Sequence, residues 1–207
     1  MRMSKNDPKW IVKELALSDT QGEVQFNIMT DSQFSSLSKP STREVDFLSN
    51  ENRVMQVITT KTDCLSNVYS QLKDQLGFER PYLKMDTQGN DFLVAQGAGD
   101  TLREFVGLQS ELSILKLYEK TIDYQALIEF YRSKGFELTA LIPNNSGFFP
   151  RLVEMDCIMH NKGVFESLER QVAHHGPPIG GTASMRDANR PTRPESNAIS
   201  RRRLDAR

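Results

Sequence analysis

The sequence predicts an α/β layer fold, with a mainly parallel sheet that is covered by helices and carries an antiparallel edge. Strand-like apolar stretches alternate with amphipathic helical stretches three times, at residues 53–76, 82–102 and 105–134, and such alternation is typical of a parallel sheet with crossover helices. Two further strand-like stretches, 136–142 and 151–160, are joined by the turn-rich loop "PNNSGFFP". A loop of this kind favours an antiparallel pair.

The N-terminal part begins with two strand-like stretches. "WIVKELAL", residues 10–17, is apolar and β-branched, and "EVQFNIM" places Val24, Phe26 and Ile28 on one face with the period of a half-buried strand. We expect these stretches to form a hairpin-like pair. The segment from about 30 to 53 is rich in Ser, Thr, Asn and Asp, which predicts a long loop that is either a functional lid or disordered.

Three strand and helix pairs follow this loop. Leu65, Leu72 and Leu76 recur at helical spacing before Gly77, and a glycine in that place is a common helix stop. The last of the three helices is followed by Gly135 in the same way. The expected elements are strands at 53–63, 82–86 and 105–115, and helices at 65–76, 90–102 and 124–134.

The length and the change in composition near the C-terminus indicate one domain and a tail. A chain of 207 residues suits a single domain, which we place at residues 7–165. Beyond about Gln171 the sequence has no aromatic residue and few apolar ones. Such a segment cannot bury enough surface to offset the entropy lost on ordering. We therefore expect a disordered tail over residues 171–207.

The composition gives no signal for a nucleic-acid or membrane partner. The formal net charge is -1, so no strong field surrounds the whole chain. No apolar run reaches the roughly 18 residues of a spanning helix, and the N-terminus lacks the apolar core of a signal peptide, so we expect a cytoplasmic protein. Cys64 and Cys157 are far apart and lack metal-ligand spacing, which indicates a reduced compartment and no metal site.

Three carboxylates follow predicted strands, where open α/β sheets bind their ligands. Asp86 lies at the tip of its strand, over the expected crevice, or it caps the helix that follows. Glu111 ends an apolar strand and would cost several kcal/mol if buried without a partner. We expect it to face a cavity or a cation such as Lys84, the alternative being a solvated side chain beyond the strand. Asp19 follows the first strand, or is simply a turn residue before Gly22.

Several stretches together resemble a known family. "ELALSDTQGEVQF", "SSL" at 35–37, "TKTDCL", "LKMDTQGNDFLVAQGA", "ELSILKLYEK", "FYRSKGFEL" and "MDCIMH" occur in that order. They are similar to the landmarks of the FkbM family of S-adenosylmethionine-dependent methyltransferases. The resemblance covers about residues 7–163 and is most specific at "LKMDTQGND". It implies a Rossmann-like class I methyltransferase sheet and O-methyl transfer to a hydroxyl group of a small molecule or sugar.

The resemblance also implies roles for individual residues. Ser18 and Asp19 would lie near the adenine end of the cofactor, S-adenosylmethionine. Asp86, with Gln88 and Gly89, would edge the pocket between methyl donor and acceptor, and Asp86 is the residue expected to act as the base or polarising group. Glu111 would lie at the tip of the fifth strand on the substrate side, as the second candidate catalytic residue.

One family feature is absent from this sequence. The family begins with a strand and a glycine-rich turn resembling Asp-x-Gly-Ala-Asn-x-Gly, then a helix and a second strand that ends in a ribose-binding acid, and no such stretch occurs here. The sequence therefore resembles the C-terminal part of a methyltransferase domain, with an incomplete sheet. The alternative is a catalytically inactive remnant or binding module that needs another chain to complete its fold. An incomplete sheet would expose edges through which copies could associate.

Overall fold

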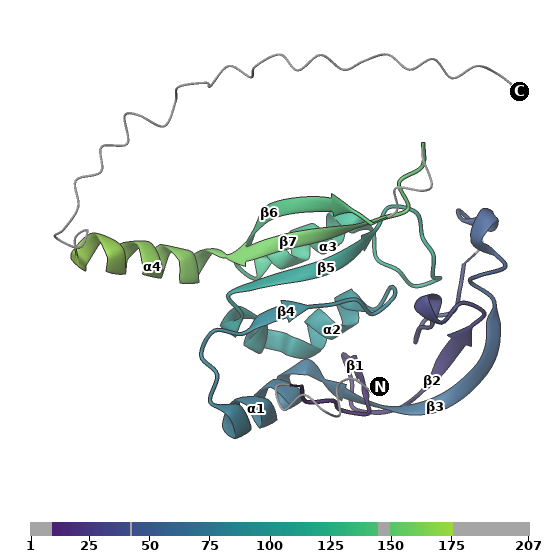
Figure 1. Cartoon of the computed structure of the whole chain (residues 1–207), viewed down its shortest axis with the longest axis horizontal. Coiled ribbons are helices and arrows are strands. Elements are labelled where there is room, and N and C mark those ends of the chain that lie inside the picture. The colour runs from purple at the N-terminus through teal and green to yellow at the C-terminus, as the bar shows by residue number, and fades with distance from the viewer. Residues whose placement is uncertain (1–9, 42, 145–149, 176–207) are drawn as a thin grey trace, which may run out of the picture.

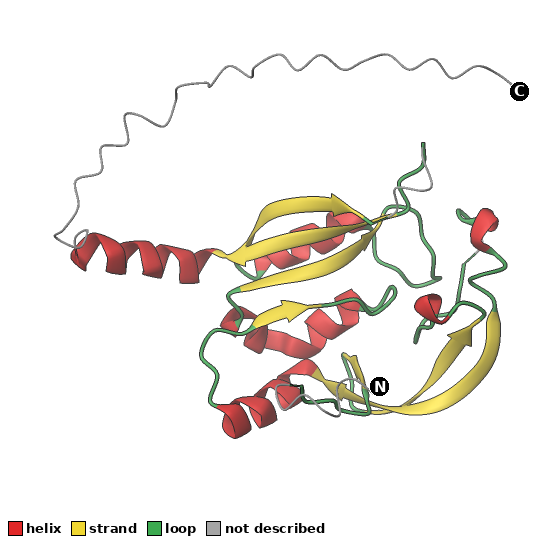
Figure 2. Ribbon diagram, viewed as in Figure 1, coloured by secondary structure: helices red, strands yellow, loops and turns green. Residues whose placement is uncertain are grey.

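The computed structural model describes residues 10–41, 43–144 and 150–175, and within these ranges the chain is an α/β protein with two mixed sheets and several helices (Figures 1 and 2). One sheet has the strand order β1-β3-β2 and the other has the order β4-β5-β7-β6. The α/β class is confirmed. The single, mainly parallel sheet expected from the sequence is wrong, because β1 and β4 end their respective sheets and do not pair with each other.

The first sheet is built around the long strand β3 (Val54–Cys64). Its last residues pair in parallel with β1 (Ala16–Ser18), and β2 (Gly22–Met29) pairs antiparallel along most of its length. The expected hairpin of residues 10–17 with β2 is wrong. Ala16 and Gly22 both pair with Thr62. Strand β3 therefore lies between the two N-terminal strands and forms backbone hydrogen bonds with both.

The segment between β2 and β3 contains no long strand or α-helix among its described residues, as expected. It holds two 3₁₀ helices, η2 (Ser32–Phe34) and η3 (Asp46–Leu48). The side-chain amide of Asn27 donates to the carbonyls of Ser36 and Ser38, both at 3.2 Å. A small apolar cluster holds the segment against the rest of the chain. Its buried members are Met29, Val45, Leu48, Leu117, Tyr118 and Val153.

The second sheet positions the candidate site. Strands β4 (Tyr82–Lys84) and β5 (Gly107–Ser113) are parallel neighbours. Strand β7 (Glu154–Asn161) lies antiparallel between β5 and β6 (Phe136–Pro143). The predicted antiparallel pair at the C-terminal end of the domain is therefore confirmed, and the carboxyl ends of β4 and β5 lie side by side.

The helices follow the strands much as the apolar spacing predicts. Helix α1 (Leu65–Leu76) ends at Gly77, whose φ of 63° is in the left-handed region that glycine favours. Helix α2 (Asp91–Ala98) continues as the 3₁₀ helix η4 (Gly99–Glu104). Helix α3 (Tyr124–Ser133) starts at Asp123, whose carboxylate accepts from the Gln125 N–H.

Helices α2 and α3 cover one face of the second sheet, and the main hydrophobic core lies between these helices and the sheet. Val94, Ala95, Leu108, Leu127 and Tyr131 are all buried there. Helix α2 also packs against β1 of the first sheet, so it links the two sheets (Figure 1). The opposite face of the second sheet carries exposed apolar side chains, including Tyr82 and Ile142.

The C-terminal part differs from its prediction in one respect. Helix α4 (Lys162–His175) follows β7 directly, so residues 171–175 are helical and do not belong to a tail. Residues 176–207, where the rest of the predicted disordered tail falls, lie outside the described residues.

Candidate functional site

The turn from β4 to α2 carries Asp86 to the carboxyl ends of β4 and β5. The Asp86 side chain is 54% exposed, and its carboxylate accepts from the Lys84 ammonium at 3.4 Å and from the Gln88 amide at 3.1 Å. It accepts no hydrogen bond from a backbone N–H of α2 in the described chain. The structure therefore contradicts the helix-cap alternative for Asp86 and supports its position at the open edge of the strand ends.

Gln88 joins the two predicted catalytic carboxylates. Its side-chain nitrogen donates to Asp86 at 3.1 Å and to Glu111 at 3.3 Å, while its amide oxygen accepts from the Tyr118 hydroxyl at 3.0 Å. The backbone of Gln88 has a φ of 52°, a conformation that costs about 1–3 kcal/mol in a non-glycine residue. The Ser36 hydroxyl helps to hold it by donating to the Gln88 carbonyl at 2.6 Å.

Glu111 lies half-buried at the carboxyl end of β5. The pKa of its carboxyl is raised to about 7, chiefly by burial and also by the nearby carboxylates of Asp86 and Asp91, against the effect of a hydrogen bond from the Asn144 amide at 3.0 Å. Glu111 was expected to face a cavity or a cation such as Lys84, and Lys84 is not that partner, because it pairs with Asp86. A carboxyl with this pKa can both accept and release a proton near neutral pH.

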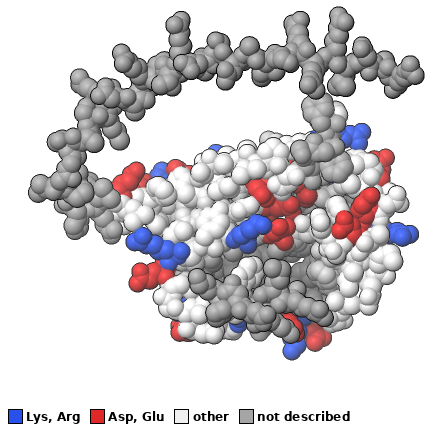
Figure 3. Space-filling view, in the orientation of Figure 1, with Lys and Arg blue, Asp and Glu red and all other residues white. Residues whose placement is uncertain are grey.

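Further acidic side chains extend this region onto β7. The pKa of the Glu154 carboxyl is raised to about 8, chiefly by burial and next by repulsion from Glu111. The carboxylate of Asp156 accepts from the Gln109 amide at 2.8 Å and from the Asn144 amide at 3.3 Å. Acidic side chains gather over the second sheet, with a basic side chain beside them (Figure 3). The region therefore favours a ligand that donates hydrogen bonds.

Asp91, at the first position of α2, fixes the geometry of the site, and the sequence reasoning assigned it no role. Its buried carboxylate accepts from the Thr87 backbone N–H at 3.0 Å and from the Thr87 hydroxyl. It also accepts from the Ser110 hydroxyl and the Glu111 backbone N–H, both at 2.8 Å. Asp91 therefore ties the turn after β4 to the end of β5. Its position in the first turn after "TQGN" is a signal that could have pointed to it.

Gly89 has a packing role that only glycine can fill. Its φ is 85°, and a Cβ atom there would lie 2.6 Å from the Tyr118 ring. The buried Tyr118 ring covers this backbone, and its hydroxyl lies 2.9 Å from the Phe34 carbonyl as well as 3.0 Å from Gln88. The segment between β2 and β3 is thus in direct contact with the site.

The other two predicted cofactor residues lie apart from this group. The buried Ser18 hydroxyl donates to Asp19 at 3.0 Å, and a Cβ atom on Gly97 of α2 would lie 2.1 Å from the Ser18 carbonyl oxygen. Within the described chain no hydrogen bond or ion pair joins Ser18 or Asp19 to Asp86 or Gln88. The predicted cofactor residues therefore form two groups, one at each end of α2.

These two groups do not form a pocket for S-adenosylmethionine. Ser18 is buried against α2 and is not open to a ligand, and Tyr118 packs against the half-buried Gly89. Four cavities of about 430–670 Å³ among the described residues are lined by other side chains. The residues present do not fit the whole cofactor unless further groups complete the site.

Comparison with protein-family models, with curated proteins and with solved structures finds no match to this chain. In the ranges that the structure describes, no cluster of three or more His, Cys, Asp or Glu side chains is arranged to hold a metal ion. A search of the described helices finds none with the length and apolar character needed to cross a bilayer.

Proposed function

We propose that this chain carries the acceptor side of an S-adenosylmethionine-dependent methyltransferase that acts on a hydroxyl group of a small molecule or sugar. The observation that carries the proposal is the position of Glu111. Its carboxyl, with a pKa raised to about 7, lies at the joined ends of β4 and β5 and is bridged to Asp86 by Gln88. The similarity of "LKMDTQGND" to the FkbM family supplies the reaction class.

In this proposal the chain's own residues orient and deprotonate the acceptor. Glu111 takes the proton of the reacting hydroxyl, because its pKa matches a neutral working pH. The more exposed Asp86 accepts a hydrogen bond from a second hydroxyl and so orients the acceptor. The sequence reasoning gave the role of base to Asp86, and the burial of Glu111 moves that role to Glu111. Asn144 and Gln88 hold the Glu111 carboxyl in place.

A second candidate function is that of a binding module completed by another polypeptide. The exposed apolar side chains of the second sheet support it, since Tyr82 is 49% and Ile142 46% exposed, and Phe165 of the adjoining helix α4 is 52% exposed. Strand β4 also pairs on one side only, and an open strand edge can accept a further strand. In this case the carboxylates at the strand ends would complete a site only in the assembled protein.

One assay distinguishes these two functions. The chain is incubated with methyl-labelled S-adenosylmethionine at about 10 mM, because an incomplete pocket predicts a Kd no tighter than about 1 mM. Sugars and small alcohols serve as acceptors. Methyl transfer is expected to require an acceptor, to rise as the pH passes about 7, and to fall by about 10²-fold or more in Glu111→Gln.

The control is Glu129→Gln, on the exposed side of α3, which should leave the rate unchanged. If the wild-type chain transfers no label to any acceptor at any pH, it is not a methyltransferase by itself. That result would favour the second candidate function, a binding module completed by another polypeptide. If Glu111→Gln and wild type transfer label equally well, Glu111 is not the base and the proposed chemistry is wrong.

A further inference from the structure

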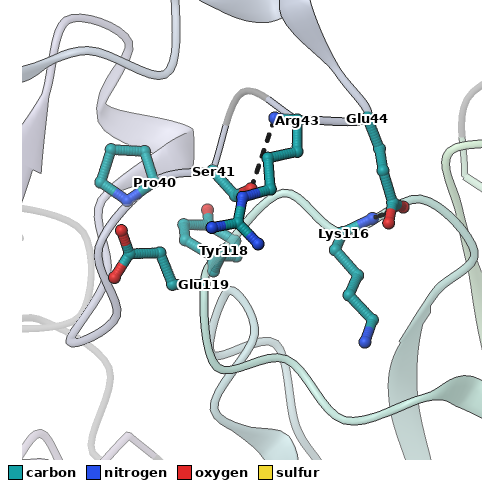
Figure 4. Close-up of a pocket in the computed structure, with 7 residues that line it drawn as sticks. All are labelled: Pro40, Ser41, Arg43, Glu44, Lys116, Tyr118 and Glu119. Atoms are coloured by element: carbon teal, nitrogen blue, oxygen red, sulfur yellow. Dashed lines mark hydrogen bonds between the residues drawn. The ribbon is translucent and has the colours of Figure 1, made fainter.

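A polar cavity of about 530 Å³ lies between residues 40–41 and 43–44 on one side and residues 116–119 on the other. Backbone pairing fixes its walls, since the Ser41 N–H donates to the Leu117 carbonyl at 2.8 Å and the Glu119 N–H donates to the Lys39 carbonyl at 3.0 Å. The cavity is therefore a built feature of the fold. Its lining residues are Pro40, Ser41, Arg43, Glu44, Lys116, Tyr118 and Glu119 (Figure 4).

Two cationic groups in this cavity are unpaired. In the described chain neither the Arg43 guanidinium nor the Lys116 ammonium forms an ion pair or a side-chain hydrogen bond. Glu44 does not neutralise them directly, because its carboxylate accepts from the Lys116 backbone N–H at 2.8 Å. In Figure 4 the Arg43 guanidinium lies between Glu119 on one side and Lys116 on the other. The guanidinium has five N–H donors, and in the described chain none of them is bonded to a protein acceptor.

We propose that this cavity binds a hydroxyl-rich small molecule that carries one oxyanion group, a carboxylate or a phosphate. The planar guanidinium of Arg43 matches two oxygens of such a group, and Lys116 adds a second positive charge. Ser41 and the exposed carboxylate of Glu119 offer partners for hydroxyl groups.

Tyr118 connects this cavity to the strand-end site. It lines the cavity, and its hydroxyl donates to the Gln88 amide oxygen at 3.0 Å. The Tyr118 side chain therefore separates a molecule held by Arg43 from the Gln88 amide that bridges the two carboxylates. The inference concerns binding alone and stands whether or not methyl transfer occurs.

Calorimetric titration of the full chain tests this inference with four probes. These are glucose phosphate, glucuronate, neutral glucose and inorganic phosphate. Glucose phosphate or glucuronate is expected to bind at least about tenfold more tightly than neutral glucose. Neutral glucose has no oxyanion and therefore cannot form the charged hydrogen bond with Arg43. Whichever of the two binds more tightly identifies the oxyanion as phosphate or carboxylate. Inorganic phosphate should bind more weakly than the hydroxylated probe, since it lacks partners for Ser41 and Glu119.

Two variants test whether the acidic probe binds in the cavity. Arg43→Gln should weaken binding of the acidic probe about tenfold or more. Lys120→Gln, an equal charge change just outside the cavity, should leave it unchanged. Arg43 is exposed, so urea unfolding of the variant should match wild type and exclude misfolding. Equal affinity for neutral and acidic probes, or an unchanged affinity in Arg43→Gln, overturns the inference.

Discussion

The carboxylate of Asp91 accepts a hydrogen bond from the backbone N–H of Glu111 at 2.8 Å. This contact joins the first turn of α2 to β5. The rest of α2 and the 3₁₀ helix η4 lie between these two positions in the sequence. The same carboxylate accepts from Thr87 in the turn after β4. The position of Glu111 relative to Asp86 therefore depends on a buried residue that does not touch the open edge of the site.

Replacing Asp91 by Asn should destabilise the protein by about 1–3 kcal/mol, because an amide cannot accept from all the donors that surround the carboxylate. Urea unfolding measures this loss. Asp100→Asn is the matched control, since Asp100 is exposed, and it should change stability by less than about 0.5 kcal/mol. Equal stability of the Asp91 variant and wild type would mean that the carboxylate does not bind these donors in solution.

The carboxyls of Glu111 and Glu154 should make stability fall as the pH rises. In the folded protein their pKa values are raised from 4.5 to about 7 and about 8. Between pH 4.5 and these values the folded state therefore holds more protons than the unfolded state. The stabilisation is complete below about pH 4.5 and is lost as the pH passes the folded values. Each proton contributes at most about 1.4 kcal/mol per pH unit.

Urea unfolding at several pH values between about 5 and 8 measures this slope. Glu154→Gln should reduce it, because the amide cannot ionise. Glu129→Gln, on an exposed position of α3, should leave the slope as in wild type. A wild-type stability that rises over this range would contradict the raised pKa values.

Gly97→Ala should destabilise the protein although alanine favours helices. The added Cβ atom would lie 2.1 Å from the Ser18 carbonyl oxygen, so β1 must move away from α2. We expect a net loss of about 1–3 kcal/mol, against a gain in helix propensity of about 0.5–1 kcal/mol. Amide exchange at residues 16–18 should also become faster.

The neighbouring Gln96→Ala supplies the control for Gly97→Ala, because Gln96 is exposed on the same helix. It should leave both stability and the exchange of β1 close to wild type. Stabilisation by Gly97→Ala would show that β1 does not pack on α2 in solution.

Local patterns in the sequence predicted most helices and strands and the edge where the carboxylates lie. The spacing of Leu65, Leu72 and Leu76 with Gly77 defined α1 because a helix is set largely by residues close in sequence. Asp86 and Glu111 could be placed at one edge because parallel neighbouring strands end on the same side.

What could not be predicted depends on contacts between residues far apart in sequence. Strand propensity over 10–17 could not show that β3 would separate β1 from β2, since pairing is decided by the partners available. Tyr118 gave no signal as a site residue, because its contacts with Phe34 and Gln88 span 84 and 30 positions. The roles of such residues emerge only from the folded chain.

Tyr118→Phe should loosen the site while keeping the ring that covers Gly89. The substitution removes the hydroxyl that lies 2.9 Å from the Phe34 carbonyl and 3.0 Å from the Gln88 amide oxygen, which leaves these acceptors without that donor. We expect a loss of about 1 kcal/mol in urea unfolding and faster amide exchange near Gln88. Because Gln88 would then hold Glu111 less firmly, the pH dependence of stability should shift as well.

The matched control is Tyr124→Phe on α3, where the hydroxyl accepts only from the neighbouring Gln125 amide at 3.3 Å in the described chain. It should change neither stability nor exchange near Gln88 by a measurable amount, since an exposed hydrogen bond contributes little. If both variants behave alike, the Tyr118 hydroxyl does not hold Gln88. The 116–119 segment would then have no effect on the carboxylates through this hydrogen bond. If only Tyr118→Phe loosens Gln88, that hydroxyl couples the polar cavity to the strand-end site.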